Sequence, residues 1–256
     1  QRQMCIRDRY KAYLKSLPGF SDIVFKEEWG VSHPFTRMIV KVKREIVALK
    51  QGDIDTKDGG TYLKPKAFME MCEKEGEDIL LIDTRNDYEY KVGHFKGAIN
   101  PHTKTFRQFP AFVDSIKDKK DKKIVMYCTG GIRCEKASAY MKQEGFTDVY
   151  QLEGGVITYI QELPNTLWEG TCFVFDKRLV SDVGQDGSPI GECICCSEKS
   201  NLFKNCKNPT CDKLDIMCVP CQEKYHGCCS ETCMKEFFTY SLERAQAKKA
   251  IVTPST

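Results

Sequence analysis

Residues 126–135 read MYCTGGIRCE, and they bring two cysteines, two glycines and an arginine close together. The apolar residues 124–127 predict a buried strand that ends at Cys128, and the apolar pattern over 137–141 predicts a helix that begins near Cys134. Cys128 is therefore expected on a strand-to-helix turn. A thiol there faces the N-terminal end of a helix, whose partial positive charge favours the thiolate.

The other residues of the loop strengthen this interpretation. Gly130 and Gly131 let the backbone fold around the sulfur, so that amide N–H groups can point at it, and Arg133 adds a positive charge. Thiolates in such surroundings have pKa values lowered by roughly one to several units. We therefore take Cys128 and Arg133 as catalytic candidates; the alternative is a structural cysteine in an α/β core. The expected active-site loop also contains Thr129, Gly130, Gly131, Ile132 and Cys134.

A cysteine phosphatase is a competing interpretation of this loop. Such an enzyme carries an arginine six positions after its nucleophile, where the guanidinium grips phosphate through two hydrogen bonds. In this chain that position is Cys134, and Arg133 comes one residue too early. The spacing therefore argues against a phosphatase. Cys134 either resolves a persulfide or disulfide on Cys128 or is a small residue at a helix start, and the second role is favoured.

Two further motifs, taken together with the cysteine loop, resemble the rhodanese domain. LLIDTRNDYEYKVGHFKGAINP occupies residues 80–101 and LEGGV occupies 152–156, in the order and spacing of that family. The resemblance covers roughly residues 60–165. It implies an α/β fold in which helices cover both faces of a parallel sheet.

The pattern of apolar residues agrees with that fold. Buried strands are predicted at 79–82, 124–128 and 149–152, with helices between them. Strands separated by helices form a parallel sheet, and the active site of such a sheet lies at the carboxyl ends of its strands, where the cysteine loop falls. Two residues at the end of the first of these strands are expected to support the pocket: Asp83 and Arg85.

The segments around the rhodanese-like part resemble a narrower family. CTGGIRCEKAS at 128–138, FVFDKR at 173–178 and the cysteine-rich tail together resemble the bacterial tRNA wobble-uridine hydroxylases, from about Tyr10 to Cys233. The resemblance implies an oxidoreductase that uses molecular oxygen to convert uridine 34 of certain tRNAs to 5-hydroxyuridine. Cys128 matches the family's proposed active cysteine. The resemblance also implies a ferredoxin-like domain before the rhodanese domain and a cysteine-rich segment after it.

This resemblance divides the chain into six parts. Residues 1–9 have no initiator Met and no periodic pattern, and they look like translated adapter sequence, so we set them aside as non-native. Residues 10–50 match only the C-terminal part of the ferredoxin-like domain, as in a truncated copy, with a helix at 10–17 and strands at 23–29 and from Arg37. The other parts are a linker at 51–60, the rhodanese domain at 61–168, the cysteine-rich segment at 169–240 and a tail at 241–256.

Ten of the fifteen cysteines lie between residues 193 and 233, and most of them form closely spaced pairs. Thiolates a few residues apart can share one tetrahedral zinc at about 2.3 Å, and a segment this short needs such a site to fold. Four pairs give two structural zinc sites. The sequence does not decide which pairs share a metal; we favour a crossed arrangement, in which the first pair joins the third and the second joins the fourth. The pairs are Cys193 with Cys196, Cys206 with Cys211, Cys218 with Cys221, and Cys229, or its neighbour Cys228, with Cys233.

Disulfides are the main alternative to zinc, and an iron–sulfur cluster is a third choice. A reactive Cys128 indicates a reducing compartment, which favours zinc. Cys195 is left over from the pairs, and His226 is a further ligand candidate, although a solvated histidine fits it better.

The composition excludes some classes of protein. No run of 18 apolar residues and no signal peptide occur among the 256 residues, so we expect a soluble, cytoplasmic protein without a membrane partner. The net charge of +3 is too small to indicate a nucleic-acid partner by itself, but residues 10–50 carry eight Lys or Arg against four Asp or Glu. A lysine-guarded edge strand explains this excess almost as well as RNA binding does. The candidates for contact with the phosphates of a tRNA anticodon stem-loop are Lys41, Lys43, Arg44 and Arg178.

The residues do not indicate how oxygen would be activated. None of the four histidines stands in an HxD or HxE pair, and no glycine-rich dinucleotide motif follows a predicted strand. Besides the hydroxylase, a sulfurtransferase with a Cys128 persulfide and a noncatalytic RNA- or protein-binding module stay open. The flanking segments favour the hydroxylase over the sulfurtransferase. The intact loop argues against the noncatalytic module.

Overall fold

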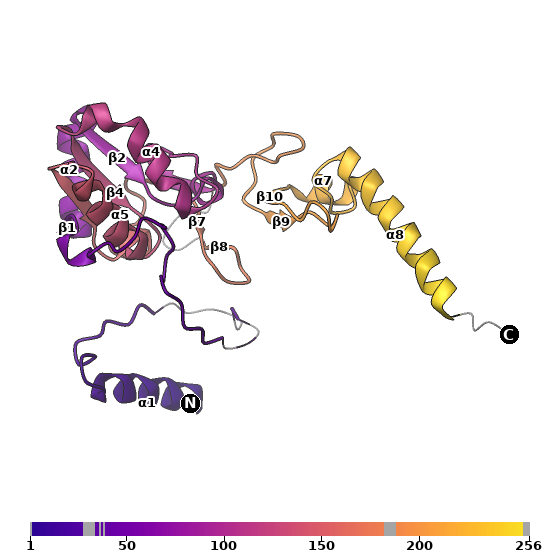
Figure 1. The fold of residues 1–256 in the computed structure, drawn as a ribbon, viewed down its shortest axis with the longest axis horizontal. Helices are drawn as coiled ribbons and strands as arrows, with labels where there is room; N and C mark the ends of the chain where they lie inside the picture. The colour runs from indigo at the N-terminus through magenta and orange to yellow at the C-terminus, as the bar shows by residue number, and fades with distance from the viewer. Residues whose placement is uncertain (1, 28–33, 36, 38, 182–187, 253–256) are drawn as a thin grey trace. The chain divides into compact units, whose positions relative to one another are not determined.

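The computed structural model divides the chain into two units, and each is treated separately (Figure 1). The units are residues 1–38 and 39–256. The residues that the structure describes are 2–27, 34–35, 37, 39–181 and 188–252.

The first unit contains the helix α1 (Arg2–Ser16). A helix was expected only at 10–17, and residues 2–9, set aside above as non-native sequence, form its first turns. Arginine, glutamine and methionine favour helices even where no periodic apolar pattern accompanies them. Local propensity therefore accounts for the longer helix.

The two strands expected before the rhodanese-like part are not formed in the described residues. Residues 28 and 29 lie outside these, but 23–27 and 39–49 contain no strand. A strand needs a neighbour that pairs with its N–H and C=O groups, and no described segment pairs with either stretch. Lys41 and Lys43 were expected in the strand from Arg37; they lie instead in a segment without regular structure, with both side chains exposed.

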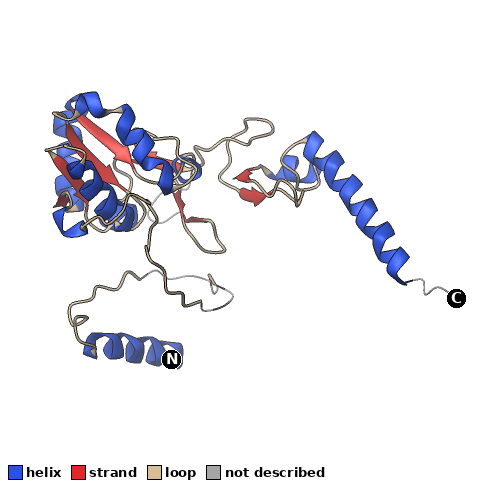
Figure 2. Cartoon of the chain, in the orientation of Figure 1, coloured by secondary structure: helices blue, strands red, loops and turns tan. Residues whose placement is uncertain are grey.

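A four-stranded parallel sheet forms the centre of the second unit (Figures 1 and 2). The strands predicted at 79–82, 124–128 and 149–152 are confirmed, and a short edge strand joins them. Their order is β1-β5-β4-β2, which places β4, the strand before the cysteine loop, inside the sheet. The bounds are β1 (Thr61–Leu63), β2 (Ile79–Asp83), β4 (Lys123–Tyr127) and β5 (Val149–Leu152).

Helices cover both faces of this sheet, and the alternating side chains of β4 show why. Ile124 and Met126 pack in one apolar cluster with α4 and α5, while Val125 and Tyr127 pack in another with α2 and α6. All four residues are fully buried, as expected for a strand between two helical layers. The helices are α2 (Pro65–Glu75), α3 (Asp87–Tyr90), α4 (Phe109–Ser115), α5 (Ile132–Gln143) and α6 (Gly155–Glu162).

Short antiparallel pairs and two helices follow the sheet in the cysteine-rich segment. The long helix α8 (Glu231–Val252) runs through the boundary expected at residue 240, so the described part of the tail is helical.

The remaining described elements are three antiparallel strand pairs, one helix and four 3-10 helices. The strand pairs are β3 (Gly93–Phe95) with β6 (Trp168–Gly170), β7 (Cys172–Phe173) with β8 (Val180–Ser181), and β9 (Phe203–Asn205) with β10 (Leu214–Ile216). The helix is α7 (Val219–Lys224), and the 3-10 helices are Thr56–Asp58, Gly76–Asp78, Phe106–Gln108 and Lys117–Lys119.

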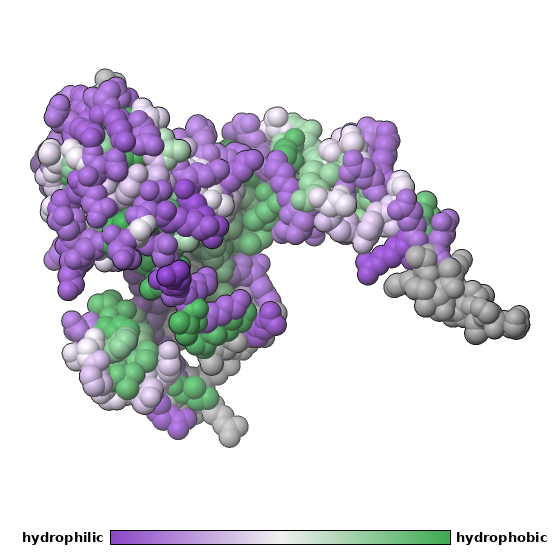
Figure 3. All heavy atoms as spheres, viewed as in Figure 1, coloured by the Kyte–Doolittle hydropathy of each residue, from purple (hydrophilic) through white to green (hydrophobic). Residues whose placement is uncertain are grey.

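The surface of the sheet domain is largely hydrophilic on the face drawn in Figure 3. Apolar side chains are exposed instead along α1 and along the segment after Met38, where Val40 and Val42 lie open to solvent. None of the described helices has the length and apolar character needed to span a membrane.

Residues 45–49 pack on the sheet domain, although the sequence assigned them to the preceding domain. Leu49 is fully buried in the cluster that contains Ile124. Glu45 accepts a hydrogen bond from the Leu49 N–H at 2.8 Å and pairs with Lys136 of α5 at 2.7 Å. The packed domain therefore begins before residue 61.

We expect Leu49→Ala to lower the free energy of unfolding of the sheet domain by about 2–5 kcal/mol, because it removes a buried side chain and leaves a cavity. Ile46→Ala is the matched control, since Ile46 is 80% exposed in the same segment. Urea unfolding followed by circular dichroism measures both variants. Equal stability of the two would show that 45–49 do not belong to the domain.

Candidate active site and cysteine clusters

Cys128 lies directly after β4, at the carboxyl end of the parallel sheet. The helix α5 begins at Ile132, two residues earlier than expected, and its N-cap Gly131 has a φ of 98° that favours glycine. The Gly131 N–H donates to the Cys128 Sγ atom at 3.1 Å. The predicted turn around the sulfur is therefore present, with the thiol at the start of a helix.

The LEGGV motif closes the loop from the other side. The N–H of Val156, in the first turn of α6, donates to the Cys128 carbonyl at 2.9 Å. A Cβ atom on Gly155 would lie 2.6 Å from the Cys128 carbonyl oxygen and 2.7 Å from that of Thr129. Only glycine therefore allows α6 to begin against the loop.

The Cys128 thiol is buried and ionises readily. Burial opposes ionisation, but a hydrogen bond from the Cys134 thiol, the charge of Arg133 and the backbone N–H groups of both residues outweigh it. Together they lower the pKa of Cys128 to about 5. At neutral pH the side chain is a thiolate, the reactive form of cysteine.

Cys134 is fully buried beside Cys128, and its Sγ atom lies 3.4 Å from the Thr84 Oγ1 atom. Burial, the hydrogen bond to Cys128 and the charge of that thiolate raise the pKa of Cys134 well above its ordinary value. Cys134 therefore stays protonated and donates to Cys128. A phosphatase would have its phosphate-binding arginine at this position.

The side chain of Arg133 acts on Cys128 through its charge, because its terminal nitrogens bind other residues. Its two terminal nitrogens donate to the carboxylate of Glu89 at 2.6 and 2.7 Å, and one also donates to the Thr129 Oγ1 atom at 3.1 Å. Glu89 is completely buried on α3. Burial raises the pKa of Glu89, but the hydrogen bonds and charge of Arg133 lower it by more. The pKa is therefore below its ordinary value, and the carboxylate is charged.

Glu89 is a residue of the site that the sequence analysis missed. A glutamate inside the motif at 80–101 looks like an ordinary residue of an exposed helix. The signal that points to it is its place at the third position of a helix that begins after Asn86, because this glutamate turns back to accept the Asn86 N–H at 3.0 Å.

Asp83 and Arg85 form a buried ion pair at 2.6 Å. Arg85 also donates to the Gly93 carbonyl at 2.6 Å, and its guanidinium lies 5.0 Å from the centroid of a Trp168 ring and 5.5 Å from that of Tyr127. The pair thus joins the end of β2 to the start of β3. The structure places both residues in the domain's framework near the loop.

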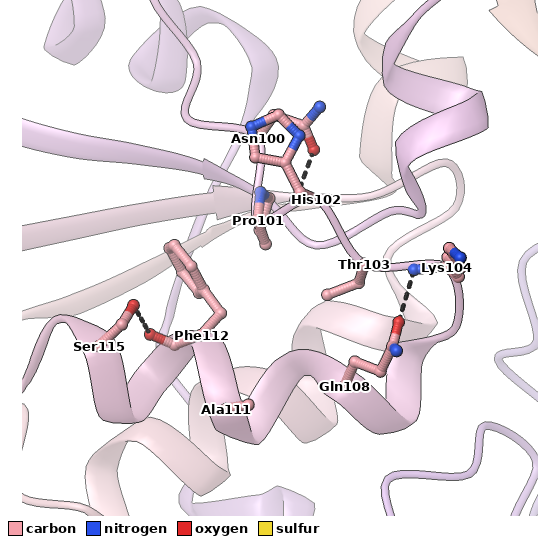
Figure 4. A pocket seen from close by; sticks show the side chains of 9 residues that line it. All are labelled: Asn100, Pro101, His102, Thr103, Lys104, Gln108, Ala111, Phe112 and Ser115. Atoms are coloured by element: carbon pink, nitrogen blue, oxygen red, sulfur yellow. Dashed lines mark hydrogen bonds between the residues drawn. The ribbon is translucent and has the colours of Figure 1, made fainter.

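A pocket of about 480 Å³ lies next to α4 (Figure 4). Much of its polar lining is already hydrogen-bonded: Gln108 accepts from the Lys104 N–H at 2.6 Å, and Asn100 accepts from the His102 N–H at 2.9 Å. None of its lining residues belongs to the Cys128 loop. These hydrogen bonds fix the loop 100–104, whose Thr103 carbonyl accepts the first N–H of α3.

The cysteine-rich segment brings eight thiols together in two clusters of four. Within each cluster all four sulfur atoms lie within 4.8 Å of one another. The first pair joins the third and the second joins the fourth, which is the crossed arrangement favoured above. The clusters are Cys193, Cys196, Cys218 and Cys221, and Cys206, Cys211, Cys229 and Cys233.

The sulfur spacing suits a tetrahedral metal. Four thiolates about 2.3 Å from a zinc ion are about 3.8 Å apart, and the structure has 3.6 Å between Cys196 and Cys218 and 3.7 Å between Cys211 and Cys229. A disulfide would require about 2.05 Å. The donor set and its geometry therefore fit two metal ions.

The leftover residues lie outside both clusters. Cys228 is fully buried beside Cys229, and Cys195 donates to the Cys229 carbonyl at 3.4 Å. His226 packs its ring 5.4 Å from that of Phe238. Of the two adjacent residues Cys228 and Cys229, Cys229 is thus the one that belongs to a cluster.

The expected RNA contacts are all exposed. Lys41, Lys43 and Arg44 lie in the segment without regular structure that precedes the buried Leu49. Arg178 lies in the turn between β7 and β8, where Asp176 accepts its side chain at 2.8 Å. The first three residues and Arg178 come from different parts of the second unit.

We expect the alkylation rate of Cys128 to rise through about pH 5 and then level off, because the thiolate reacts and the pKa is about 5. Cys134→Ala removes a hydrogen bond to the thiolate, so its midpoint should move to higher pH. Mass spectrometry of the Cys128 peptide after timed iodoacetamide treatment gives the rates. Cys72→Ala, on α2, should leave the profile unchanged. A wild-type midpoint near about 8.5, as in a free thiol, would contradict the assignment.

Family models match both halves of the second unit. A model described as a rhodanese-like domain matches residues 64–162, and one described as a rhodanase C-terminal region matches 169–234. A solved rhodanese-like domain from Anabaena sp. covers 43% of this chain at 21% identity, with a TM-score of 0.36.

Several proteins that resemble the chain over most of its length carry the name tRNA uridine(34) hydroxylase. The protein from Cytophaga hutchinsonii is 42% identical over 227 residues, which make up 88% of this chain and 72% of that protein. The proteins from Bacillus licheniformis and Onion yellows phytoplasma are 43% and 45% identical and are covered to 71% and 74%. Since these matches extend well beyond the rhodanese-like domain on both sides, the chain belongs to the tRNA uridine(34) hydroxylase family.

Proposed function

We propose that this chain hydroxylates uridine 34 of tRNA at carbon 5, with molecular oxygen as the co-substrate and Cys128 as the catalytic residue. The observation that carries the proposal is the stabilised thiolate at the carboxyl end of the sheet, in a chain of this family. A free thiol would be only a few per cent ionised at neutral pH. Arg133 and the loop amides keep Cys128 ready to react.

A sulfurtransferase with a Cys128 persulfide is the runner-up. The loop would hold a persulfide with the same amide donors, but this activity needs neither the N-terminal segment nor the region 169–234. These segments account for the similarity beyond the rhodanese-like domain. Their presence therefore favours the hydroxylase.

We further propose that the two cysteine clusters hold structural zinc. Each cluster supplies four thiolates in a segment whose small core is otherwise made of few apolar residues, such as Met217. Zinc bound there would contribute directly to the folding of the segment. Reduced thiols and a tRNA substrate both agree with a cytoplasmic location.

The anticodon stem-loop is the proposed RNA partner. A base turned out of its loop can reach the Cys128 loop, but one base gives little grip on the stem, whose phosphates require cations. Lys41, Lys43 and Arg44 are exposed and are the proposed phosphate contacts, together with Arg178.

Cys128→Ser should abolish 5-hydroxyuridine at position 34, because serine is not ionised at neutral pH and cannot replace the thiolate. The test expresses this chain in bacterial cells that lack their own hydroxylase and measures tRNA nucleosides by mass spectrometry. Cys72→Ser is the control and should give wild-type levels. Normal 5-hydroxyuridine with Cys128→Ser would refute the catalytic assignment. If the wild-type chain gave 2-thiouridine and no 5-hydroxyuridine, the sulfurtransferase would be favoured.

Replacing Lys41, Lys43 and Arg44 with Glu should weaken tRNA binding and flatten its salt dependence, since three phosphate contacts are lost. Fluorescence anisotropy with an anticodon stem-loop RNA, measured over a salt series, gives both quantities. The control replaces Lys119, Lys120 and Lys122, which lie at the opposite end of β4 from Cys128. An unchanged salt slope in the first variant would place the RNA surface elsewhere.

Elemental analysis should find about two zinc ions per purified chain. Cys229→Ala should lower the content to about one, whereas Cys228→Ala should keep two, because only Cys229 belongs to a cluster. These adjacent residues control for each other. Metal-free protein with the cysteines recovered as disulfides would overturn the zinc proposal.

A further inference from the structure

Phe175 is a large apolar side chain that stays exposed at the edge of the active site. It lies in the turn between β7 and β8 and is 57% exposed. Its ring centroid lies 5.7 Å from the guanidinium carbon of Arg133, the residue whose charge stabilises the Cys128 thiolate. Burial does not explain its position, since the core is complete without it.

Aromatic packing and a backbone hydrogen bond hold the turn that carries Phe175 in place. Phe173, the residue two positions before it, is buried and contacts Phe175 at 5.2 Å between ring centroids. The Phe173 ring also contacts Tyr88 at 5.0 Å and Phe203 at 5.1 Å, so it is fixed by both α3 and the cysteine-rich segment. The Val174 N–H donates to the Leu179 carbonyl at 2.9 Å and closes the turn.

The surroundings of Phe175 suit RNA. Lys177 and Arg178 are exposed in the same turn, and Arg133 lies against the ring. A flat aromatic ring next to cations is the arrangement with which proteins stack unpaired bases beside a phosphate chain. The turn belongs to the region 169–234, so a rhodanese-like domain alone would not have it.

We propose that Phe175 stacks on uridine 34 or on one of its two neighbours, bases 33 and 35, and so positions uridine 34 at the Cys128 loop. This inference rests on the proposed function, because it names a substrate-positioning residue for the same site. A stacked neighbour would hold the loop open while the target base enters. The Phe175 ring supplies the flat surface on which the base stacks, and the positive charge of Arg133 attracts the π-face of that ring.

The test measures binding of the whole chain to an anticodon stem-loop RNA by fluorescence anisotropy. Phe175→Ala should weaken binding roughly 5- to 150-fold, the range found when one stacking partner is removed. Phe175→Tyr keeps the ring and should stay within about threefold of wild type. Phe238→Ala is the matched control, since Phe238 is also an exposed aromatic residue and belongs to another element, α8.

A second set of RNAs separates stacking from a structural effect. Each RNA lacks one base, at position 33, 34 or 35, and keeps the sugar and phosphate. If Phe175 stacks on a base, the wild-type chain and Phe175→Ala should bind equally the RNA that lacks that base. The inference would be overturned if Phe175→Ala bound all three of these RNAs more weakly than the wild-type chain by the same factor. It would also be overturned if Phe175→Ala bound the intact RNA as tightly as the wild-type chain. If the wild-type chain still binds and hydroxylates the intact RNA, only the inference about Phe175 is wrong and the proposed function stands. If the wild-type chain neither binds nor hydroxylates it, the proposed function itself is wrong.

Discussion

The buried ion pair between Glu89 and Arg133 is the interaction on which the site depends. It joins α3 to the first turn of α5, and Thr129 in the loop hydrogen-bonds to both partners. Breaking a buried pair by removing one partner typically costs about 3–5 kcal/mol, because the other charge is left without compensation. The pair therefore fixes the loop and also places a cation beside Cys128. Stability and thiolate formation have the same origin in this site.

The cysteine-rich segment follows a different principle. Its core is divided into two small clusters. Met217 packs with Cys193, Cys218 and Cys221 in one cluster, and Ile216 packs with Phe173 in the other. So few apolar atoms cannot offset the chain entropy lost on folding. The sulfur clusters take the place of a hydrophobic core, and the aromatic contacts of Phe173 with Tyr88 and Phe203 connect this segment to the sheet domain.

The sequence predicted the elements whose signals are local. Continuous apolar runs marked β2, β4 and β5, the glycines marked the turn around Cys128, and the cysteine spacing agreed with the two clusters. It missed features that depend on distant partners. The stretch from Arg37 predicted a strand, but no segment that the structure describes pairs with it. Nothing near Glu89 in sequence indicates Arg133. Phe175 lies two positions after Phe173 in an apolar stretch, and only the fold shows that Phe173 is buried and Phe175 exposed.

Because Leu49 is fully buried, the folded domain extends beyond the part that resembles a rhodanese. The rhodanese-like similarity begins at residue 64, yet β1 starts at Thr61, the Gly60 N–H donates to Ser138 of α5 at 2.8 Å, and Leu49 fills the core beside Ile124. A chain cut at residue 64 would lose its edge strand and expose an apolar hollow. The smallest piece expected to fold by itself therefore starts at or before Glu45, well before the first residue that the rhodanese-like match covers.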